Sequence, residues 1–469
     1  MNRFAPARGA TAVVAVVVVV AVSAACTPDA APRPDPGVPS PSRSTPTAAP
    51  TDSPSAAAPV EAACTQPLVI ATHQTRRPLR LSEERARRLL DGSGGRRTVD
   101  SAAALVADPD ALAVLPAAQV GPRVRVAVVG GMHPLRRPAA YPLRTKTGRC
   151  VPRPTTLTVV GDIMLGRRVA DAAGDEPGRQ LRATAARLRS ADVTVGNLES
   201  TLSMAGAPTQ GGDSFAADPS VAGELVGAGF DVLSLANNHA GDFGPLALRQ
   251  TVHRLARAGL VTFGAGRDLA AARRPALVTR RGTSFGFVGF NAIGETPEAG
   301  PGRTGALSVS MPPRTGPLDR AELDRFLGDV RRTARRVDVV VALPHWGTQY
   351  TNVPEPVQRQ VAREVVSAGA DLVVGGHPHW VQGVSTIRDA PVLHSLGNFV
   401  FDMDFMAQTQ VGVVLETVWW GDRLKAVELV PYEMDESFTP RFVSWRDGLP
   451  TLRLLWATSG PAFSRRVSP

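Results

Sequence analysis

Five short stretches of the chain each place a potential metal ligand directly after an apolar, β-like run. They are GDIMLGR, GNLEST, LSLANNHAGDFG, PHWG and VVGGHPHW, and they follow one another from Gly161 to about His379. Together they supply oxygen and imidazole groups: Asp162, Glu199, Asn238, His239, His345, His377 and His379. This mixture of ligand types predicts a two-metal hydrolytic centre. The chain has only eight histidines, so the concentration of four of them in these stretches is informative.

Each of the first three stretches also has an ordinary structural explanation. Asp162 could be a helix N-cap, and Glu199 could pair with one of the many arginines. Asn238 and His239 could form an Asn-rich turn with a capping histidine. Because adjacent side chains point in different directions, we predict that Asn238 binds metal and that His239 acts on a substrate oxyanion or leaving group. His345 follows the apolar run VDVVVALP and is predicted to be a further ligand.

His377 and His379 form the most specific pair of candidate ligands. They follow two glycines and stand two residues apart, and residues two apart in an extended segment share a face. Pro378 between them fixes its own φ and favours extended backbone at His377. We therefore predict an extended segment that holds both rings on one side, with two ordinary core histidines as the alternative.

The candidate ligands need elements that bring them together, and the sequence predicts such elements. From Leu157 to His379, apolar β-branched runs alternate with helical patterns, which is typical of an α/β domain with sheets buried on both faces. After His379 the helical pattern fades, and strand-like runs predict a sheet-rich C-terminal part of the same domain. In such folds ligands collect beyond the carboxyl ends of the strands, which is where every candidate ligand lies.

The N-terminus has the order of a secretory signal. A basic segment, the apolar run Ala10–Val22 and three small residues precede Cys26. The apolar run is short for a membrane span, and its junction with Cys26 resembles a bacterial lipobox, in which the cysteine carries a lipid. Plain secretion is the alternative. We predict a signal peptide over residues 1–26, a disordered linker rich in Pro, Ala, Ser and Thr over 27–63, and an extracytoplasmic protein with a lipid anchor in the cell membrane.

Residues 64–150 are predicted to form a small α/β module ahead of a main domain over 155–455. Cys64 and Cys150 bracket the module, and in an oxidising compartment a disulfide between them is expected over two free thiols. Part of the module is weakly similar to a periplasmic phosphate-type binding protein, so one reading is that it senses a small anion. His73 and His133 are expected at its surface.

The formal net charge of +10 comes mostly from arginines that are dispersed along the chain. Dispersed charge, without a recognisable motif, argues against a nucleic-acid partner. It indicates either an arginine-rich proteome or attraction to an anionic wall polymer, a phosphate ester or lipid headgroups. We therefore predict an anionic polymer or a phosphoester as the substrate and no nucleic acid.

A longer set of motifs follows in order between Leu157 and Asp402: GDIML, GNLES, LANNHAGDFG, HWG, GADLVVGGHPHWVQG and HSLGNFVFD. This set resembles the capsule-synthesis CapA family, the poly-γ-glutamate capsule proteins related to calcineurin-like metallophosphoesterases. The resemblance implies an α/β fold, a four-layer α/β sandwich of metallophosphoesterase type that follows the small N-terminal α/β module. It also implies a dinuclear metal site and a membrane-associated role in making or releasing an anionic capsular polymer.

The resemblance also assigns individual residues. The metal ligands of the phosphoesterase relatives correspond here to Asp162, Glu199, Asn238, His345, His377 and His379. His239 completes their Asn-His pair. Because the ligand set is rich in imidazole, the expected cofactors are two divalent ions of Mn, Fe or Zn. Asp242 and Asn398 are predicted to orient the ligands through hydrogen bonds, with turn formation as the alternative.

Two departures from the family pattern affect the function that we predict. Met164 replaces the first-motif histidine, and Gly376 replaces the first histidine of Gly-His-His-Pro-His. The leading prediction is an exported, membrane-tethered, metal-dependent hydrolase that acts in synthesis or release of an anionic capsular or cell-wall polymer such as poly-γ-glutamate. The alternative is a non-catalytic, polymer-binding accessory subunit of a membrane synthase complex, which the loss of the first-motif histidine favours.

Overall fold

The computed structural model describes residues 64–93, 95, 97–147 and 150–465. The predicted signal peptide, Cys26 and the predicted linker lie outside the described residues. Among the helices of the described residues, none combines the length and the apolar character that crossing a membrane requires.

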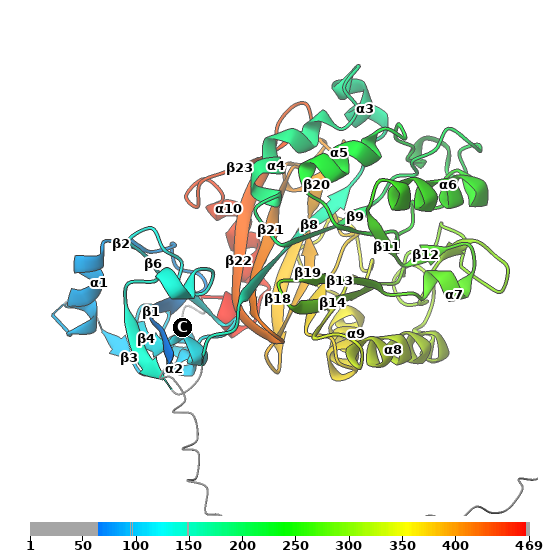
Figure 1. Ribbon diagram of the computed structural model, residues 1–469. Helices are drawn as coiled ribbons and strands as arrows, with labels where there is room; N and C mark the ends of the chain where they lie inside the picture. Colours follow the sequence, from blue (N-terminus) through cyan, green and yellow to red (C-terminus); the bar gives the residue numbers. More distant parts are fainter. Residues whose placement is uncertain (1–63, 94, 96, 148–149, 466–469) are drawn as a thin grey trace, which may run out of the picture. The chain divides into compact units, whose positions relative to one another are not determined.

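The first described segment forms a small sheet with two helices, drawn in blue and cyan in Figure 1. The strand β1 is central, with β4 and β5 on either side of its C-terminal half and β7 paired to its beginning, all antiparallel to it. Each helix begins at a serine whose hydroxyl accepts a hydrogen bond from a backbone N–H of the first turn. The elements are β1 (Cys64–His73), β2 (Arg80–Leu81), α1 (Glu83–Leu90), β3 (Thr98–Val99), α2 (Ala102–Ala107), β4 (Leu112–Pro116), β5 (Val124–Val126), β6 (Val128–Val129) and β7 (Arg144–Thr147).

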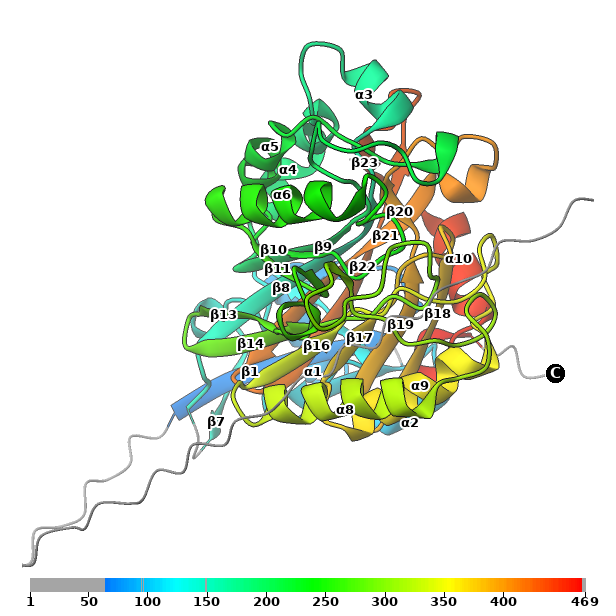
Figure 2. The same cartoon turned by 90° about the vertical axis from the view of Figure 1, so that its right-hand side faces the viewer.

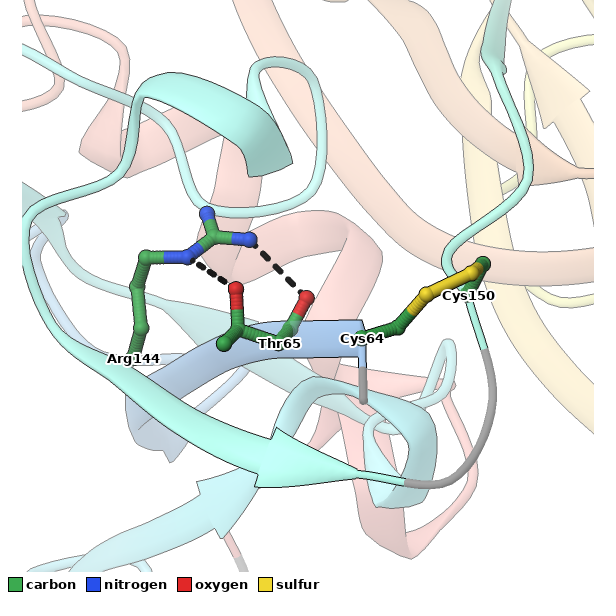
Figure 3. The surroundings of a disulfide bond; sticks show 4 residues. All are labelled: Cys64, Thr65, Arg144 and Cys150. Atoms are coloured by element: carbon green, nitrogen blue, oxygen red, sulfur yellow. Dashed lines mark hydrogen bonds between the residues drawn. A yellow bond between two sulfur atoms is a disulfide. The ribbon is translucent and has the colours of Figure 1, made fainter. Parts of the chain in front are cut away.

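A disulfide joins the two ends of this module. Cys64 begins β1, and Cys150 follows β7 with a sequence separation of 86 residues (Figure 3). Beside the bond, the Arg144 guanidinium donates hydrogen bonds to the hydroxyl of Thr65 at 2.7 Å and to its carbonyl oxygen at 2.9 Å. The disulfide therefore closes a loop that contains the whole module, and such a bond is typical of an extracytoplasmic protein.

The two module histidines are not at the surface, and that expectation was wrong. His73 is fully buried, with its Nε2 3.1 Å from the carbonyl oxygen of Pro461. His133 lies mostly buried, with its Nε2 3.0 Å from the carboxylate of Glu428. Both rings contact C-terminal segments that lie far away in the sequence, so the local sequence could not reveal their burial.

The first large sheet has the order β11-β10-β9-β8-β21-β22-β23, and β20 also pairs with β8. Its half from β8 to β11 is parallel, whereas β21 to β23 are antiparallel to their neighbours. Its strands are β8 (Pro154–Ile163), β9 (Val193–Leu198), β10 (Val232–Ser234), β11 (Val261–Phe263), β20 (Asn398–Val400), β21 (Val411–Trp420), β22 (Arg423–Met434) and β23 (Pro440–Phe442).

The second large sheet has the order β13-β14-β16-β17-β19-β18. The strands β14, β16, β17 and β19 are parallel, and an antiparallel strand lies at each edge. Its strands are β13 (Ala276–Arg280), β14 (Thr283–Val288), β16 (Val339–Ala342), β17 (Leu372–Val374), β18 (Val381–Ile387) and β19 (Ala390–Leu396). A short ribbon pairs β12 (Ala265–Gly266) with β15 (Gly305–Ala306).

Helices cover the outer faces of the two large sheets, as Figures 1 and 2 show. One core cluster lies between the sheets and joins residues such as Val159 of β8 to Phe285 of β14. A second cluster packs α4, α5 and α6 on the first sheet, and a third packs α8 and α9 on the second. The helices are α3 (Arg167–Ala173), α4 (Arg182–Leu188), α5 (Val221–Ala228), α6 (Gly244–Arg257), α7 (Leu269–Ala272), α8 (Arg320–Ala334), α9 (Pro356–Ser367) and α10 (Leu449–Ala457).

The mixed α/β architecture with several sheets confirms the predicted class, and the sheet-rich segment after His379 is present as β18 to β22. The helix α10, however, lies where no helical pattern was recognised. Its sequence LPTLRLLWA is apolar on most faces, so it lacks the period that identifies an amphipathic helix. The described residues belong to one compact unit, and the small module shares a core cluster with β21 and β22. A domain boundary between residues 150 and 155 therefore stays a prediction.

The disulfide should contribute measurably to stability. Replacement of Cys64 and Cys150 by serine should lower the free energy of unfolding by about 2–4 kcal/mol, because the unfolded chain gains the freedom of a long loop. Denaturant unfolding of the oxidised wild type and of the double variant measures the difference. The wild type treated with a reductant is the matched control and should unfold like the variant; equal stability of all three forms would contradict the expectation.

Candidate metal centre

Asp162 is the penultimate residue of the long strand β8 and lies almost completely buried, at 1% exposure. Gly161 before it lets the chain pass close to β20, since a Cβ there would lie 1.9 Å from the carbonyl oxygen of Gly397. The Asp162 carboxylate accepts a hydrogen bond from Asn197 Nδ2 at 2.8 Å and one from the backbone N–H of His377 at 2.9 Å. The carboxylate is therefore held between two strand ends, one in each large sheet.

Glu199 follows β9 and is fully buried. Neither of its carboxylate oxygens has a hydrogen-bond partner among the described residues. The Nε2 atom of His345 does lie 2.8 Å from Oε1 of Glu199, but the contact lacks hydrogen-bond geometry. A buried carboxylate without partners is costly, so this position favours a cation.

His379 completes a compact set of ligand atoms. Each residue of the triad Asp162, Glu199 and His379 has one potential ligand atom within 4.8 Å of those of the other two. All three residues are buried, so this triad could hold a metal ion. The Nδ1 atom of His379 lies 2.7 Å from Oδ1 of Asn398, which leaves Nε2 as the ligand atom. Asn398 therefore fixes the orientation of the ring, and its role beside a bound metal stays a prediction.

His345 and Asn238 extend this set. His345 follows β16 and Asn238 follows β10, and Nε2 of the histidine lies 2.8 Å from Oδ1 of the asparagine. The Nδ2 atom of Asn238 donates to the carboxylate of Glu295 at 2.7 Å, and Arg314 donates to the other oxygen of Glu295 at 2.5 Å. This chain of contacts fixes the carboxamide of Asn238 with its oxygen toward His345 and Glu199.

His377 also belongs to this set, but its backbone is not extended. Its ring centroid lies 5.1 Å from that of His345 and 5.7 Å from that of His379, and neither ring nitrogen has a hydrogen-bond partner among the described residues. The φ angles are 92° at His377 and 58° at His379, so the predicted extended segment was wrong. Such angles are strained for residues with side chains and are typical of functional sites. Here, the hydrogen bond from the His377 N–H to Asp162 overrides the preference imposed by Pro378.

His239 stands beside these residues with a separate set of contacts. Its ring stacks on Phe215 at a centroid distance of 3.7 Å, and its Nδ1 lies 2.8 Å from the carboxylate of Asp242. That carboxylate also accepts hydrogen bonds from Gln210 and from the backbone of Phe215. Asp242 thus holds the His239 ring, and Nε2 is the nitrogen of His239 left for other contacts. That Asp242 orients a ligand of a metal stays a prediction.

Burial sets the protonation of these groups. It raises the pKa of Asp162 to about 7, with the nearby Glu199 carboxylate as a further cause, and it raises the pKa of Glu199 to about 7. It lowers the pKa of His345 to about 4 and that of His379 to about 3. The imidazoles are consequently neutral at neutral pH, as metal ligation requires.

Three polar residues of the centre were missed by the sequence analysis: Asn197, Glu295 and Arg314. Asn197 could have been found, because it stands two residues before Glu199 in the β9 segment and shares its face. Besides its bond to Asp162, its Nδ2 lies 3.3 Å from Nδ1 of His345. Glu295 and Arg314 lie in loops without a motif, and the sequence held no indication of them. Met164, where the resemblance led us to expect a histidine, is fully buried in the core beneath the helices.

The profile of the family described as bacterial capsule synthesis protein PGA_cap matches residues 156–403, which include every residue of this centre. The chain belongs to this family. The resemblance predicted from the motifs is thereby confirmed.

Curated relatives carry matching names. The chain is 28% identical over 321 residues to the capsule biosynthesis protein CapA of Bacillus anthracis, covering 67% of this chain and 75% of that protein. It is 28% identical over 287 residues to the PGA biosynthesis protein CapA of Bacillus subtilis, covering 60% and 68%. A probable polyglutamine synthesis accessory protein of Mycobacterium tuberculosis is 34% identical over 176 residues, covering 37% and 46%. Among solved structures, a hypothetical protein of Thermus thermophilus matches with 17% identity and a TM-score of 0.37, covering 60% of this chain and 99% of that one.

Metal binding should depend on pH in a defined direction. Carboxylates of an unfolded chain lose their protons near pH 4, whereas Asp162 and Glu199 lose theirs near pH 7. The folded, metal-free protein therefore holds more protons between these values, and its stability falls as the pH rises through that window. A divalent ion needs the ionised carboxylates, so its affinity should rise over the same window.

Denaturant unfolding with EDTA or with Mn²⁺, at about pH 5 and about pH 8, measures both effects. The stability difference between the two forms should be larger at the higher pH. The variant Glu199→Gln should lose most of this difference, and Glu84→Gln, at an exposed site in α1, should keep it. A difference that does not change with pH would contradict the assignment of these two carboxylates.

Gly376 should be required for the position of Asp162. A Cβ at Gly376 would lie 2.5 Å from Oδ1 of Asp162 and 3.1 Å from Nδ1 of His345. The variant Gly376→Ala should therefore displace both side chains and weaken Mn²⁺ binding by about tenfold or more. Calorimetric titration measures the affinity. Gly223→Ala in α5, where nothing lies within 4 Å of the new Cβ, is the matched control, and equal affinity in the two variants would be the contrary result.

Proposed function

We propose that the chain is an exported metal-dependent hydrolase with the four-layer sandwich fold of the metallophosphoesterases. Its substrate would be a phosphoester or an amide bond in an anionic capsular or cell-wall polymer such as poly-γ-glutamate. Family membership supports the role in capsule synthesis. The small module over 64–150 and the main domain over 155–455 are part of the same proposal, as is the lipid anchor at Cys26.

One observation carries the proposal. The carboxylate of Glu199 and both ring nitrogens of His377 are buried without hydrogen-bond partners among the described residues. Such groups cost several kcal/mol when they are unpaired. They lie beside Asp162 and His379, whose ligand atoms point to the same small volume. Bound cations would satisfy all of these atoms at once, and no ordinary packing role does so.

The chain offers enough ligands for two ions. The residues that would hold them are Asp162, Glu199, Asn238, His345, His377 and His379. Divalent ions such as Mn, Fe or Zn would polarise the scissile group and make water a better nucleophile. The two carboxylates would compensate part of the positive charge, and the remainder would attract phosphate or carboxylate groups of the substrate. Asn238 donates a hydrogen bond to Glu295 and His379 donates one to Asn398, which would keep these two ligands in fixed orientations.

His239 would act on the substrate. Its Nδ1 is engaged by Asp242 and its ring is held against Phe215, so Nε2 can contact a substrate oxygen or pass a proton to the leaving group. It is close enough to Glu199 to stabilise the ionised form of that carboxylate. Arg167 lies over Phe215 at 4.3 Å and pairs with Asp402. That arginine would supply a positive rim for an anionic chain.

A second candidate function is a non-catalytic, polymer-binding subunit of a membrane synthase complex. The specific observation is Met164, which replaces a ligand of the first motif with a buried apolar side chain. The mycobacterial relative named as an accessory protein of polyglutamine synthesis supports this candidate. The two candidates differ in metal content and in turnover, so one set of measurements separates them.

The variant His377→Ala should abolish hydrolysis if the chain is an enzyme. Substitutions of groups that only orient a ligand reduce metal affinity or activity by about 10–100-fold, so loss of a ligand should cost at least about 100-fold. The assay uses a chromogenic phosphodiester and poly-γ-glutamate with Mn²⁺, together with elemental analysis. The control is His253→Ala, because His253 is an exposed histidine of α6. Less than one ion per chain, with intact polymer binding and no turnover, would establish the accessory role instead.

A further inference from the structure

A second candidate site lies at the seam between the small module and the large sheets. A cavity of about 580 Å³ opens there, which is within the size range of small-molecule sites. The module contributes the segment Ala118–Arg123, and the rest comes from the end of α9 and from the β18–β19 and β21–β22 turns. Asp371 of its wall stands before β17, whereas His377 follows that strand. The seam cavity is therefore at the opposite end of the sheet from the metal centre.

Lys425 is the unusual residue of this cavity wall. It is 4% exposed, and its ammonium donates one hydrogen bond, to the carbonyl oxygen of Ala118 at 3.0 Å. The ammonium also lies 5.3 Å from the ring centroid of Trp420. Among the described residues it has no ion pair with a carboxylate, and burial lowers its pKa to about 8. A buried cation without a counter-charge is destabilising, so the site is incomplete as it stands.

Two arginines strengthen the positive side of the cavity. Arg423 is exposed and close enough to Lys425 to lower its pKa further, and Arg388 lies exposed in the β18–β19 turn. Neither guanidinium donates to a side chain or a carbonyl within the described part of the chain. By contrast, Arg123 is already paired with Asp389 at 3.4 Å. Three cations thus line the cavity without an ion pair to a carboxylate in that part of the chain.

The acidic groups of the wall limit the kind of ligand. Asp371 accepts a hydrogen bond from the backbone of Val340 at 2.8 Å, and burial raises its pKa to about 6, with Asp422 as a further cause. These two carboxylates disfavour a long polyanion, whereas a single anionic group can contact the Lys425 ammonium without lying against them. The small volume of the cavity also favours a small anion over a long polymer.

We propose that the seam cavity binds a small anion, through a carboxylate or phosphate group that contacts the Lys425 ammonium, with Arg388 and Arg423 at the rim. The anion supplies the counter-charge that the lysine lacks. Because Ala118 of the module and Lys425 of β22 are joined at this point, the ligand also ties the module to the first large sheet. This site is independent of the metal centre and of the hydrolase proposal.

The test is calorimetric titration of the full chain in EDTA, so that anions do not bind through metal ions. Inorganic phosphate and L-glutamate are the two probes, and they distinguish phosphate from carboxylate recognition. We expect one site per chain for at least one of them. Lys425→Met keeps an unbranched side chain of similar length without the charge and should weaken binding at least tenfold, while raising the melting temperature of the ligand-free protein.

The chain supplies its own control, because Lys146 is the only other lysine of the sequence and is exposed. Lys146→Met should leave the affinity unchanged. The double variant Arg388→Gln and Arg423→Gln changes only exposed side chains and should weaken binding at least threefold. It tests the proposal independently if the Lys425→Met variant does not fold. Absence of binding for both probes in the wild type, or unaltered affinity in the double variant, would overturn the proposal. Neither result depends on whether the metal centre binds metal or catalyses hydrolysis.

Discussion

The architecture of this protein depends on two buried carboxylates. Burying their charge costs free energy, and the parallel strands of the two large sheets end beside them. Glu199 and Asp162 lie at 0% and 1% exposure, so they are removed from the water that would normally stabilise their ionised forms. The fold places them beside three neutral imidazoles and the carboxamide oxygen of Asn238, all of which can donate electron pairs. A cluster of this kind is unfavourable by itself and would become favourable with cations, so a bound cation would also stabilise the fold.

The positioning of this cluster comes from both sheets. The strands β8, β9 and β10 of the first sheet lead to Asp162, Glu199 and Asn238, and β16 and β17 of the second lead to His345 and His377. The two sheets are joined at this point by direct contacts, such as the hydrogen bond from the His377 backbone to Asp162. Between the sheets lies a large apolar cluster, and the candidate ligands are held at its edge by this packing.

The strand ends and the family could be predicted from the sequence, whereas the backbone at His377 and the partners of several residues could not. The strand ends were recognisable because each apolar run stops at a polar ligand, and the order of the motifs identified the family. The backbone at His377 was not recognisable, because its positive φ goes with a hydrogen bond that its N–H donates to Asp162, more than two hundred residues earlier. Glu295 and His73 were also out of reach, since their partners lie in distant segments and no local pattern encodes such contacts.

The pairing of β8 has a consequence for how the chain can be divided. The family profile ends at residue 403, but β8 is covered on one side by β21, whose residues Val411–Trp420 come later. A fragment that stops where the profile stops would leave the central strand of the first sheet with an open hydrogen-bonding edge, and such edges recruit other strands and aggregate. The segment that completes the first sheet is therefore longer than the segment that the family profile matches.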